Sequence, residues 1–229
     1  FARVPRLAAW HRRAAALGPA SSGVGRLVDR AWSGSRARRV GDLAQQQPTI
    51  ENAYGTYRGI FTRREAARLT AHFTGVMPDP PAAAPPSEAT DASDGDAITR
   101  LELTRYARNQ LLRDSDVMSM AFGLELRTPF LDCELVDVLS RLPASTRLEP
   151  GKGLIRRAVP ELPSWVTGRQ KQCFQFPFEQ WLGAEWTDLF ADAAGPRSVP
   201  MDTWYRKWSV FVLESWMNLI EPATHAQKR

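Results

Sequence analysis

The stretch "RNQLLRDSDVMSMAFGLELRTPFLD", Arg108–Asp132, places the tightest constraint on the fold of this 229-residue chain. Acidic residues and arginines alternate in it with Leu, Met and Phe. An isolated buried charge costs several kcal/mol, so buried charges in such a segment must be paired. We therefore predict an internal ion-pair network of Arg113, Asp114, Asp116, Glu125, Arg127 and Asp132. Such a network can be purely structural, or it can form the walls of a polar substrate cleft.

The sequence on both sides of this stretch predicts helices and no strand. A helix is expected from about 97 to 113, with one apolar face made of Leu103, Tyr106, Ala107 and Leu111. Asp132 is a favourable N-cap for a second helix, which Pro143 ends. A short helix is expected from near Gly151 to before Pro160 or Pro163.

A last helix, at about 201–220, carries a broad apolar stripe that we expect to be core rather than a cofactor site. The stripe consists of Trp204, Trp208, Phe211, Val212, Trp216 and Leu219.

The chain divides into three regions by composition. Residues 1–75 read as several short helices separated at Pro19, Gly23, Gly34, Gly41 and Pro48. Residues 76–97 hold five prolines and five acids, and so few large apolar residues that we expect a flexible surface loop. Residues 98–229 are the helical region that carries the motifs.

Bulk composition indicates a folded chain without a membrane span. The hydrophobic fraction of 43%, with 8 Trp and 10 Phe, is sufficient for a packed core. No apolar run approaches the roughly 18 residues that a span requires, and no secretory signal is recognisable. With two cysteines, Cys133 and Cys173, no disulfide framework is expected, which favours the cytoplasm. Because the first residue is Phe1, we expect a fragment or a processed chain.

Residues 1–75 contain 13 Arg and 4 acids, a balance that could suit nucleic acid or phosphate groups. The arginines lack interleaved aromatics and an accompanying nucleic-acid motif, so a solvated helical surface is favoured and no nucleic-acid partner is expected.

General catalytic motifs are absent from the sequence: it has no G-x-G-x-x-G, P-loop, H-E-x-x-H or G-x-S-x-G. The three histidines, His11, His72 and His225, are scattered, so no metal site is expected. Cys173 follows Lys171 closely, which could lower its pKa, but without a nearby His in sequence a structural thiol is favoured over a nucleophile.

The stretch Asn109–Asp132 resembles the "N-L-x-R-x-D-x-x-S-M-x-x-x-x-E-x-R-x-P-F-L-D" stretch of the glutamine-dependent asparagine synthetase family. It agrees at Asn109, Leu112, Arg113, Asp116, Ser119, Met120, Glu125, Arg127, Pro129, Phe130, Leu131 and Asp132. "GKGLIRRAVPELPSWVTGRQKQCFQFPFEQWL", Gly151–Leu182, is similar to a later block of that family, "G-K-x-L-L-R-x-A…L-P-x-x-V-x-x-R-x-K-x-G-F-x-x-P-F-x-x-W-L". The blocks occur in the family's order, which makes a chance match improbable.

The resemblance implies a fold class and also what the chain does not contain. It implies a mainly α chain, the helical C-terminal portion of an α/β synthetase domain of the ATP-pyrophosphatase type (adenine nucleotide alpha hydrolase-like), with little or no strand. The family's S-G-G-x-D-S nucleotide loop, its D-E-x-F-x-G-Y segment and its glutaminase domain are not found in residues 1–229. We expect that missing N-terminal half on the same polypeptide or on a separate subunit.

The resemblance also implies chemistry. In this family a small-molecule carboxylate attacks the α-phosphorus of ATP, which is bound with Mg²⁺, and ammonia from glutamine or another amine then displaces AMP. The Lys of the family's R-x-K motif maps onto Lys171, which is the expected catalytic residue. The expected support of the substrate or nucleotide cleft comes from Arg169, Arg113, Asp116, Glu125, Arg127 and Asp132.

Two departures leave an alternative open. Cys173 stands where the family has Gly, and Cys133 stands where a His is common. A Gly can adopt a positive φ that a Cys adopts only with strain, so the geometry around Lys171 is in question. We expect the chain alone to be incomplete and inactive. The alternative is a degenerate, catalytically inactive remnant that serves as a binding or regulatory module or subunit.

Overall fold

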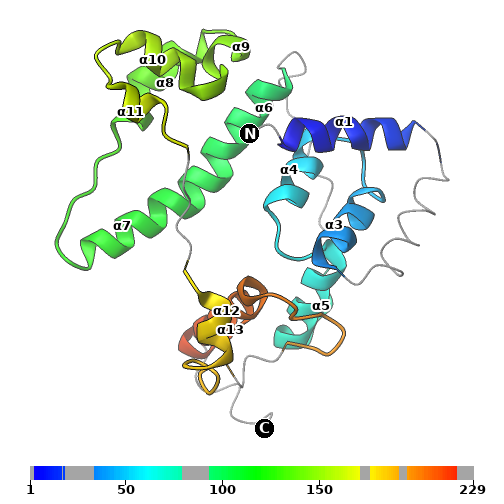
Figure 1. The fold of residues 1–229 in the computed structure, drawn as a ribbon. Coiled ribbons are helices and arrows are strands. Elements are labelled where there is room, and N and C mark those ends of the chain that lie inside the picture. The colour runs from blue at the N-terminus through cyan, green and yellow to red at the C-terminus, as the bar shows by residue number, and fades with distance from the viewer. Residues whose placement is uncertain are drawn as a thin grey trace. The chain divides into compact units, whose positions relative to one another are not determined.

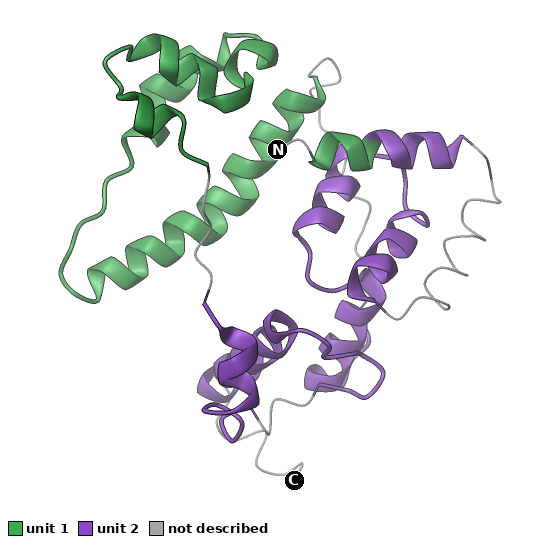
Figure 2. Ribbon diagram, viewed as in Figure 1, with its two compact units in different colours: residues 1–8, 86–173 green, residues 9–85, 174–229 purple. Residues whose placement is uncertain are grey.

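The computed structural model describes residues 3–16, 18, 34–78, 93–170, 176–190 and 195–220, and Figure 1 shows their arrangement into helices. No strand occurs among those residues, which confirms the expectation of a mainly helical chain for that part. The chain forms two compact units, coloured separately in Figure 2. Unit 1 comprises residues 1–8 and 86–173, and unit 2 comprises residues 9–85 and 174–229. Helix α1 (Arg3–Ala15) contributes to both units.

After α1, the first part of unit 1 that the structure describes is a continuous helical rod. It consists of α6 (Asp94–Leu101), the wide helix η1 (Glu102–Leu112) and α7 (Arg113–Met120), as Figure 1 shows. The helix predicted for 97–113 is thus confirmed, but it is longer at both ends. Its i→i+5 hydrogen bonds in η1 are not foreseeable from the apolar spacing, because π-type turns have no common sequence pattern.

The rod begins earlier than expected because Ser93 and Asp96 form a capping box. The Ser93 hydroxyl accepts from the Asp96 N–H at 3.2 Å, and the Asp96 carboxylate accepts from the Ser93 N–H at 3.3 Å. Two otherwise orphaned donors are satisfied in this way. The end of the predicted loop 76–97 is therefore helical, whereas residues 79–92 lie outside the described part.

The rest of unit 1 is a series of short elements: η2 (Pro129–Leu131), α8 (Cys133–Ser140), α9 (Ala144–Arg147), η3 (Pro150–Lys152), α10 (Gly153–Ala158) and α11 (Ser164–Thr167). The helices predicted after Asp132 and near Gly151 are α8 and α10. Helix α9 packs on the start of α6, where a Cβ on Gly95 would lie only 3.0 Å from the Ala144 Cβ. The Arg147 guanidinium joins the same two helices through an ion pair with Asp96.

Unit 2 contains α3 (Ser35–Leu43), α4 (Ile50–Arg58), α5 (Arg63–Thr74), α12 (Phe178–Gly183) and α13 (Trp204–Ile220). The short helices expected in residues 1–75 are confirmed where the structure describes them. Gly34 lies at a helix boundary, as expected, because it is the N-cap of α3. Gly41, also expected to separate two helices, lies inside α3 instead. Gly41 is buried there, so tertiary packing overrides its low helix propensity.

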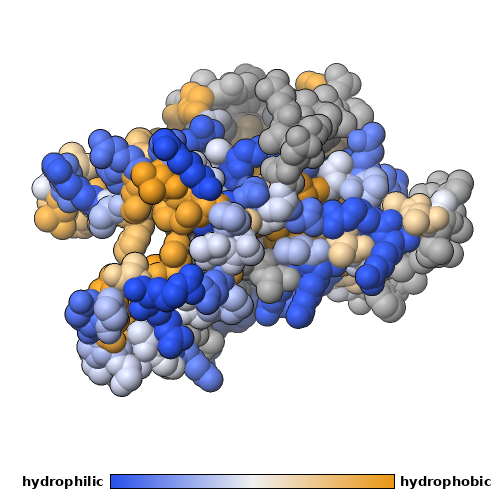
Figure 3. Space-filling view, turned by 90° about the horizontal axis from the view of Figure 1, so that it is seen from above, coloured by the Kyte–Doolittle hydropathy of each residue, from blue (hydrophilic) through white to orange (hydrophobic). Residues whose placement is uncertain are grey.

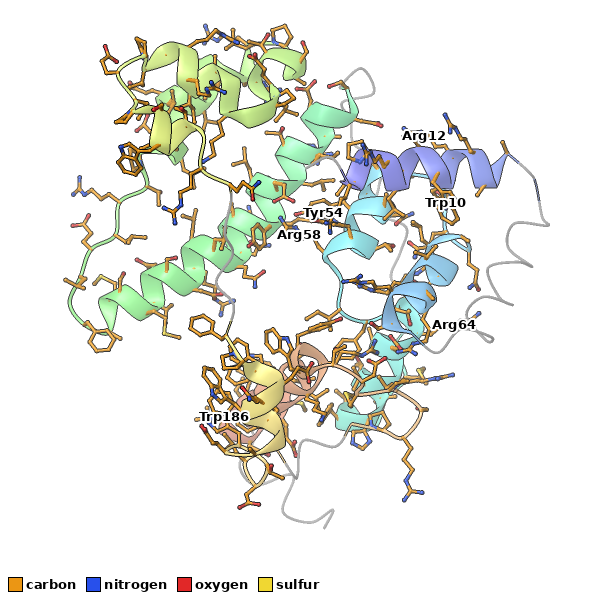
Figure 4. The ribbon with its side chains drawn as sticks, viewed as in Figure 1. Trp10, Arg12, Tyr54, Arg58, Arg64 and Trp186 are labelled. Carbon is orange, nitrogen blue, oxygen red and sulfur yellow. The ribbon has the colours of Figure 1, made fainter. Side chains whose placement is uncertain are left out.

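The described part of unit 2 contains two clusters of buried apolar side chains. Leu69, Val199 and Val210 make the first, with Phe61, Phe73 and Met201 against it. Leu182 and Phe190 make the second, with Trp186, Trp204 and Phe211 against it. The Phe178 ring stacks on the Trp204 ring at 4.3 Å, so the second cluster joins α12 to α13. Figure 4 labels Trp186, whose ring lies 5.0 Å from that of Trp181.

The expectation that the whole apolar stripe of α13 is core is wrong. Trp204 and Phe211 pack in the second cluster, but Trp208, Val212, Trp216 and Leu219 are exposed. The buried positions on α13 are Arg206 and Val210. A fully buried arginine lies opposite to what hydropathy predicts, and its burial depends on acidic partners that sequence spacing does not show.

Arg206 lies in an ion cluster that holds α3, α5 and α13 together. Its Nη2 lies 2.8 Å from Glu65 Oε2, and its guanidinium carbon lies 4.5 Å from the centre of the Phe61 ring. The N–H groups of Arg206 do not point at an acceptor with the geometry of a hydrogen bond, so its contact with Glu65 is an ion pair rather than a hydrogen bond. Arg38 bridges Glu65 and Asp202 at 3.1 Å and 3.2 Å.

Candidate functional site

An open hollow of about 320 Å³ lies in unit 1 where the helical rod meets the chain that follows α7. Its lining consists of Leu112, Arg113, Asp116, Leu126 and Thr128. Arg113 and Asp116 are three residues apart in α7, so their side chains emerge on one face of the helix. The structure thus brings together two of the residues expected to support the cleft, one cationic and one anionic.

Segment 124–128, which is neither helix nor strand, supplies the other wall of the hollow. Glu125 and Arg127 alternate in it with Leu126 and Thr128, and the latter two line the hollow. Arg127 Nη2 lies 3.0 Å from Glu125 Oε1, and Arg127 Nε donates to the same oxygen at 3.1 Å. These two predicted site residues are therefore paired with each other beside the hollow rather than in its lining.

Asp132 has a structural role that the sequence predicted. Its Oδ1 accepts hydrogen bonds from the N–H groups of Glu134 at 3.0 Å and Leu135 at 3.2 Å, which makes it the N-cap of α8. The prediction of an N-cap at this position is confirmed. Its expected second role, in cleft support, stays a prediction.

The expectation of an internal ion-pair network is wrong for this chain. Its proposed members are exposed, and the ion pair formed within the set is Glu125–Arg127, in the part of the chain that the structure describes. The prediction assumes that this segment is buried. It is not, since the neighbouring apolar side chains, such as Met118 and Phe122, are exposed as well. Charges that remain hydrated need no partner to offset a desolvation cost.

Lys171, the expected catalytic residue, and Cys173 lie outside the described residues. Arg169 lies two residues after α11 and is exposed. The aromatic residues at and around the start of α12 are in contact with one another: Phe176 lies 5.7 Å from Phe178, and Phe178 lies 5.4 Å from Trp181, measured between ring centres. Because Phe178 also stacks on Trp204, the described chain from Phe176 onward is fixed to the core of unit 2.

The sequence interpretation overlooked Leu126 and Thr128 as lining residues. Their alternation with Glu125 and Arg127 is a pattern that could have identified them, because period-two spacing predicts a shared side. Pro129 adds a second indication, since a residue before proline is disfavoured in helical backbone, and Thr128 has φ −119° and ψ 82°.

The hollow can bind a polar ligand by complementary charge. The Arg113 guanidinium supplies hydrogen-bond donors in a geometry that suits a carboxylate or a phosphate, and the Asp116 carboxylate supplies acceptors for an amine or a hydroxyl. Leu112 and Leu126 give it an apolar side. No group of three or more His, Cys, Asp or Glu residues suited to a metal ion occurs in the described ranges, and no described helix is long and apolar enough to cross a membrane.

Comparison with known proteins finds the same family that the sequence motifs resemble. The sequence model of the asparagine synthase family matches residues 2–216. Asparagine synthetase (glutamine-hydrolyzing) 1 of Bacillus subtilis is 34% identical over 102 residues, 43% of this chain and 16% of that protein. A putative asparagine synthetase (glutamine-hydrolyzing) of Mycobacterium tuberculosis is 39% identical over 90 residues, 38% of this chain and 14% of that protein.

No solved structure matches the chain significantly. The matched part of the chain spans about one sixth or less of the length of these curated relatives. The family match, by contrast, extends over most of the chain and includes every residue expected to form the site. The chain therefore belongs to the asparagine synthase family.

Proposed function

We propose that the chain is the C-terminal, helical part of an ATP-dependent amide ligase of the asparagine synthetase type. The observation that carries the proposal is the hollow that joins Arg113 and Asp116 inside the segment whose motif resembles the family. The proposed reaction is adenylation of a small-molecule carboxylate by ATP, followed by amide formation with ammonia from glutamine or with another amine. Residues 1–229 would form part of the domain that performs this reaction, a synthetase domain of the adenine nucleotide alpha hydrolase-like class.

Lys171 is the proposed catalytic cation. Negative charge increases on the α-phosphate and on the departing pyrophosphate in the transition state, and an ammonium group placed beforehand stabilises that charge strongly where water is excluded. The aromatic cluster of Phe176, Phe178 and Trp181 supports this role, because it holds Phe176, which follows Lys171 closely in the sequence, against α12. Arg169 adds a second cation close to Lys171 in the sequence.

The hollow in unit 1 is proposed as a wall of the substrate or nucleotide cleft. Arg113 would face an anionic part of the substrate, and Asp116 would orient a polar group beside it. Glu125, Arg127 and Asp132 would act indirectly, by fixing the extended segment and the start of α8 around the hollow. ATP would enter with Mg²⁺, but we assign no ligand of that ion to this chain, because the family's nucleotide-loop motif is not found in residues 1–229.

The proposal requires a partner. The nucleotide loop, and a glutaminase domain where glutamine is the nitrogen donor, would be supplied by an N-terminal half on the same polypeptide or on a separate subunit. The length of the curated relatives supports this requirement, since the match covers 16% of one and 14% of the other. The proposed location is the cytoplasm, where ATP and amino acids are available.

The test is substrate-dependent turnover of ATP to AMP and pyrophosphate by the chain together with the N-terminal half. Lys171→Ala is expected to lower kcat about 10²- to 10³-fold, which is the usual effect of removing one preorganised electrostatic contact. Lys207→Ala is the matched control, because Lys207 is an exposed lysine on α13 and should leave turnover unchanged. Equal turnover by wild type and Lys171→Ala would exclude the catalytic assignment.

The alternative, a catalytically inactive remnant that acts as a binding or regulatory module, rests on Cys173. If this residue alone prevents the working geometry around Lys171, Cys173→Gly should create turnover that the wild type lacks. If both forms are inactive with the N-terminal half present and bound, the binding-module alternative is favoured. Turnover by the wild type at a rate typical of enzymes would rule that alternative out.

A further inference from the structure

Large apolar side chains are concentrated and exposed on the chain that surrounds the hollow. We call this group the apolar strip: Val117, Met118, Met120, Phe122, Leu124, Leu126 and Phe130. Phe122 is 82% exposed, Phe130 71% and Met118 68%. Scattered apolar residues are normal on a protein surface, but a run of this density is typical of a surface that another protein covers.

The apolar strip belongs to a region without a core of its own. Residues 102–170 are all described, and Gly153 is the buried residue among them. Unit 2, by contrast, has two clusters of buried apolar side chains. Figure 3 shows hydrophobic residues (orange) exposed beside hydrophilic ones (blue) on the face that it displays. Burial of apolar area supplies most of the stability of a fold, so the region needs a surface that covers it.

The composition of the apolar strip favours a protein partner over a small ligand. Exposed charged residues lie beside it in the sequence, namely Arg113, Asp116, Glu125 and Arg127, and exposed apolar residues accompanied by polar ones are the usual pattern of a protein interface. The comparisons suggest which protein would cover the apolar strip. The strip lies inside the family match, and the matched part of the chain is 14% to 16% of the curated relatives, so most of such a protein lies outside the match.

We propose that the apolar strip is the surface on which the N-terminal, nucleotide-loop half of the synthetase packs, and that this contact completes the hollow beside Arg113 and Asp116. The inference rests on the proposed function, since that function requires such a half. Leu126 connects the two surfaces, because it lines the hollow and is also a member of the strip. Association and the substrate cleft are therefore linked through one short segment.

The test measures association of the chain with the N-terminal part of the Mycobacterium tuberculosis relative, ending where its match to this chain begins. Binding is followed by calorimetry. The variants are Phe122→Asp and Met118→Asp, each of which would bury an unpaired carboxylate in the proposed interface. We expect the Kd to rise by more than about tenfold in each, as is typical of residues central to an interface. Leu219→Asp on α13 is the matched control, because Leu219 is 81% exposed and should leave the Kd unchanged.

Folding of the isolated variants is checked by circular dichroism, and is expected to be unchanged because the substituted side chains are exposed. The proposal is overturned if the wild-type chain does not bind, if the strip variants bind like wild type, or if Leu219→Asp weakens binding as much. It is also overturned if the strip variants abolish only self-association, measured by light scattering, which would make a second copy the occupant. Pyrophosphate release by the same complex is scored separately, so tight binding without turnover contradicts the proposed function alone.

Discussion

At the scale of single residues, Asp132 shows how a motif residue can serve structure and site at once. Its carboxylate accepts two backbone N–H groups at the start of α8, and this contact explains the presence of an acid at that position without any substrate. The position directly follows η2, which ends the segment that forms the hollow. A substitution that separates the cap from the charge can therefore decide between the two roles.

Asp132→Ala is expected to destabilise α8 by about 1 kcal/mol, because the cap is lost. Asp132→Asn should cost much less, since the amide oxygen can still accept from Glu134 and Leu135. Native-state hydrogen exchange of the α8 amides measures both effects. If Asp132→Asn retains protection but loses turnover in the assembled enzyme, the negative charge has a function in the site. If both properties are retained, Asp132 is a cap alone.

His11 gives a prediction for the dependence of stability on pH. Burial lowers the pKa of His11 below the ordinary value of 6.5, while a backbone contact with Gln46, short of ideal hydrogen-bond geometry, opposes that shift. The folded state thus binds fewer protons than the unfolded state in this window. Stability from neutral His11 is complete above about pH 6.5 and is lost as the pH falls through that value towards the lower folded pKa.

We expect the free energy of unfolding of wild type to fall between pH 7.5 and pH 5.5, on either side of the ordinary His pKa of about 6.5. His11→Gln should show a smaller fall, because it cannot take up a proton. Chemical denaturation at the two pH values measures this difference. His72→Gln serves as the control, since His72 is less buried on α5. Parallel pH dependence of wild type and His11→Gln would show that His11 is not the responsible group.

At the scale of elements, sequence patterns identified the helical rod, α8, α10 and α13, but they did not identify α9, α11 or α12, nor which face of α13 is buried. The N-cap at Asp132 and the stop at Pro143 are local, and local geometry decides them. The burial of Arg206 depends on Glu65, which is 141 positions away in the chain and cannot be inferred from spacing. The hollow also combines a local and a non-local property. Arg113 and Asp116 share a helix face because of their spacing, which the sequence shows, whereas their exposure depends on which other parts of the protein cover the segment, which the sequence does not show.

The ion cluster of α3, α5 and α13 predicts strong coupling between Glu65 and Arg206. Glu65→Gln leaves a fully buried Arg206 without its nearest counter-ion, at an expected cost of about 3 kcal/mol. Arg206→Met should cost less, because Glu65 keeps its ion pair with Arg38 and its hydrogen bond from the Thr62 N–H. The double variant is expected to be more stable than the sum of the two single effects predicts.

Equilibrium denaturation of the four proteins in this cycle gives the coupling energy. The matched control is the exposed pair Asp137–Arg141 on and just after α8, for which Asp137→Asn should change stability by less than about 0.5 kcal/mol. Additivity of the Glu65 and Arg206 substitutions would show that the buried pair contributes no specific coupling. A large effect at Asp137 would instead indicate a general sensitivity of the chain to loss of negative charge.

At the scale of the whole molecule, residues 102–170 of unit 1 and the described part of unit 2 differ in how much apolar surface they bury. That part of unit 2 contains two apolar clusters, and its ion cluster ties three helices together. Residues 102–170 of unit 1 bury no large apolar side chain, yet they include the Asn109–Asp132 motif and lie entirely within the family match. A region built in this way is stable only when its exposed apolar residues are covered, so its order should depend on the partner.

Hydrogen exchange of the isolated chain is therefore expected to be fast for residues 102–170 and slower for α5 and α13 of unit 2, since opening requires little loss of buried area in the first case. Addition of the N-terminal half should increase protection most around the apolar strip, and by more than about tenfold at saturation, because binding stabilises the form that it recognises. Unit 2 serves as the internal control. Slow exchange of residues 102–170 in the isolated chain would mean that the region is held by contacts of its own, and the requirement for a covering partner would then be removed.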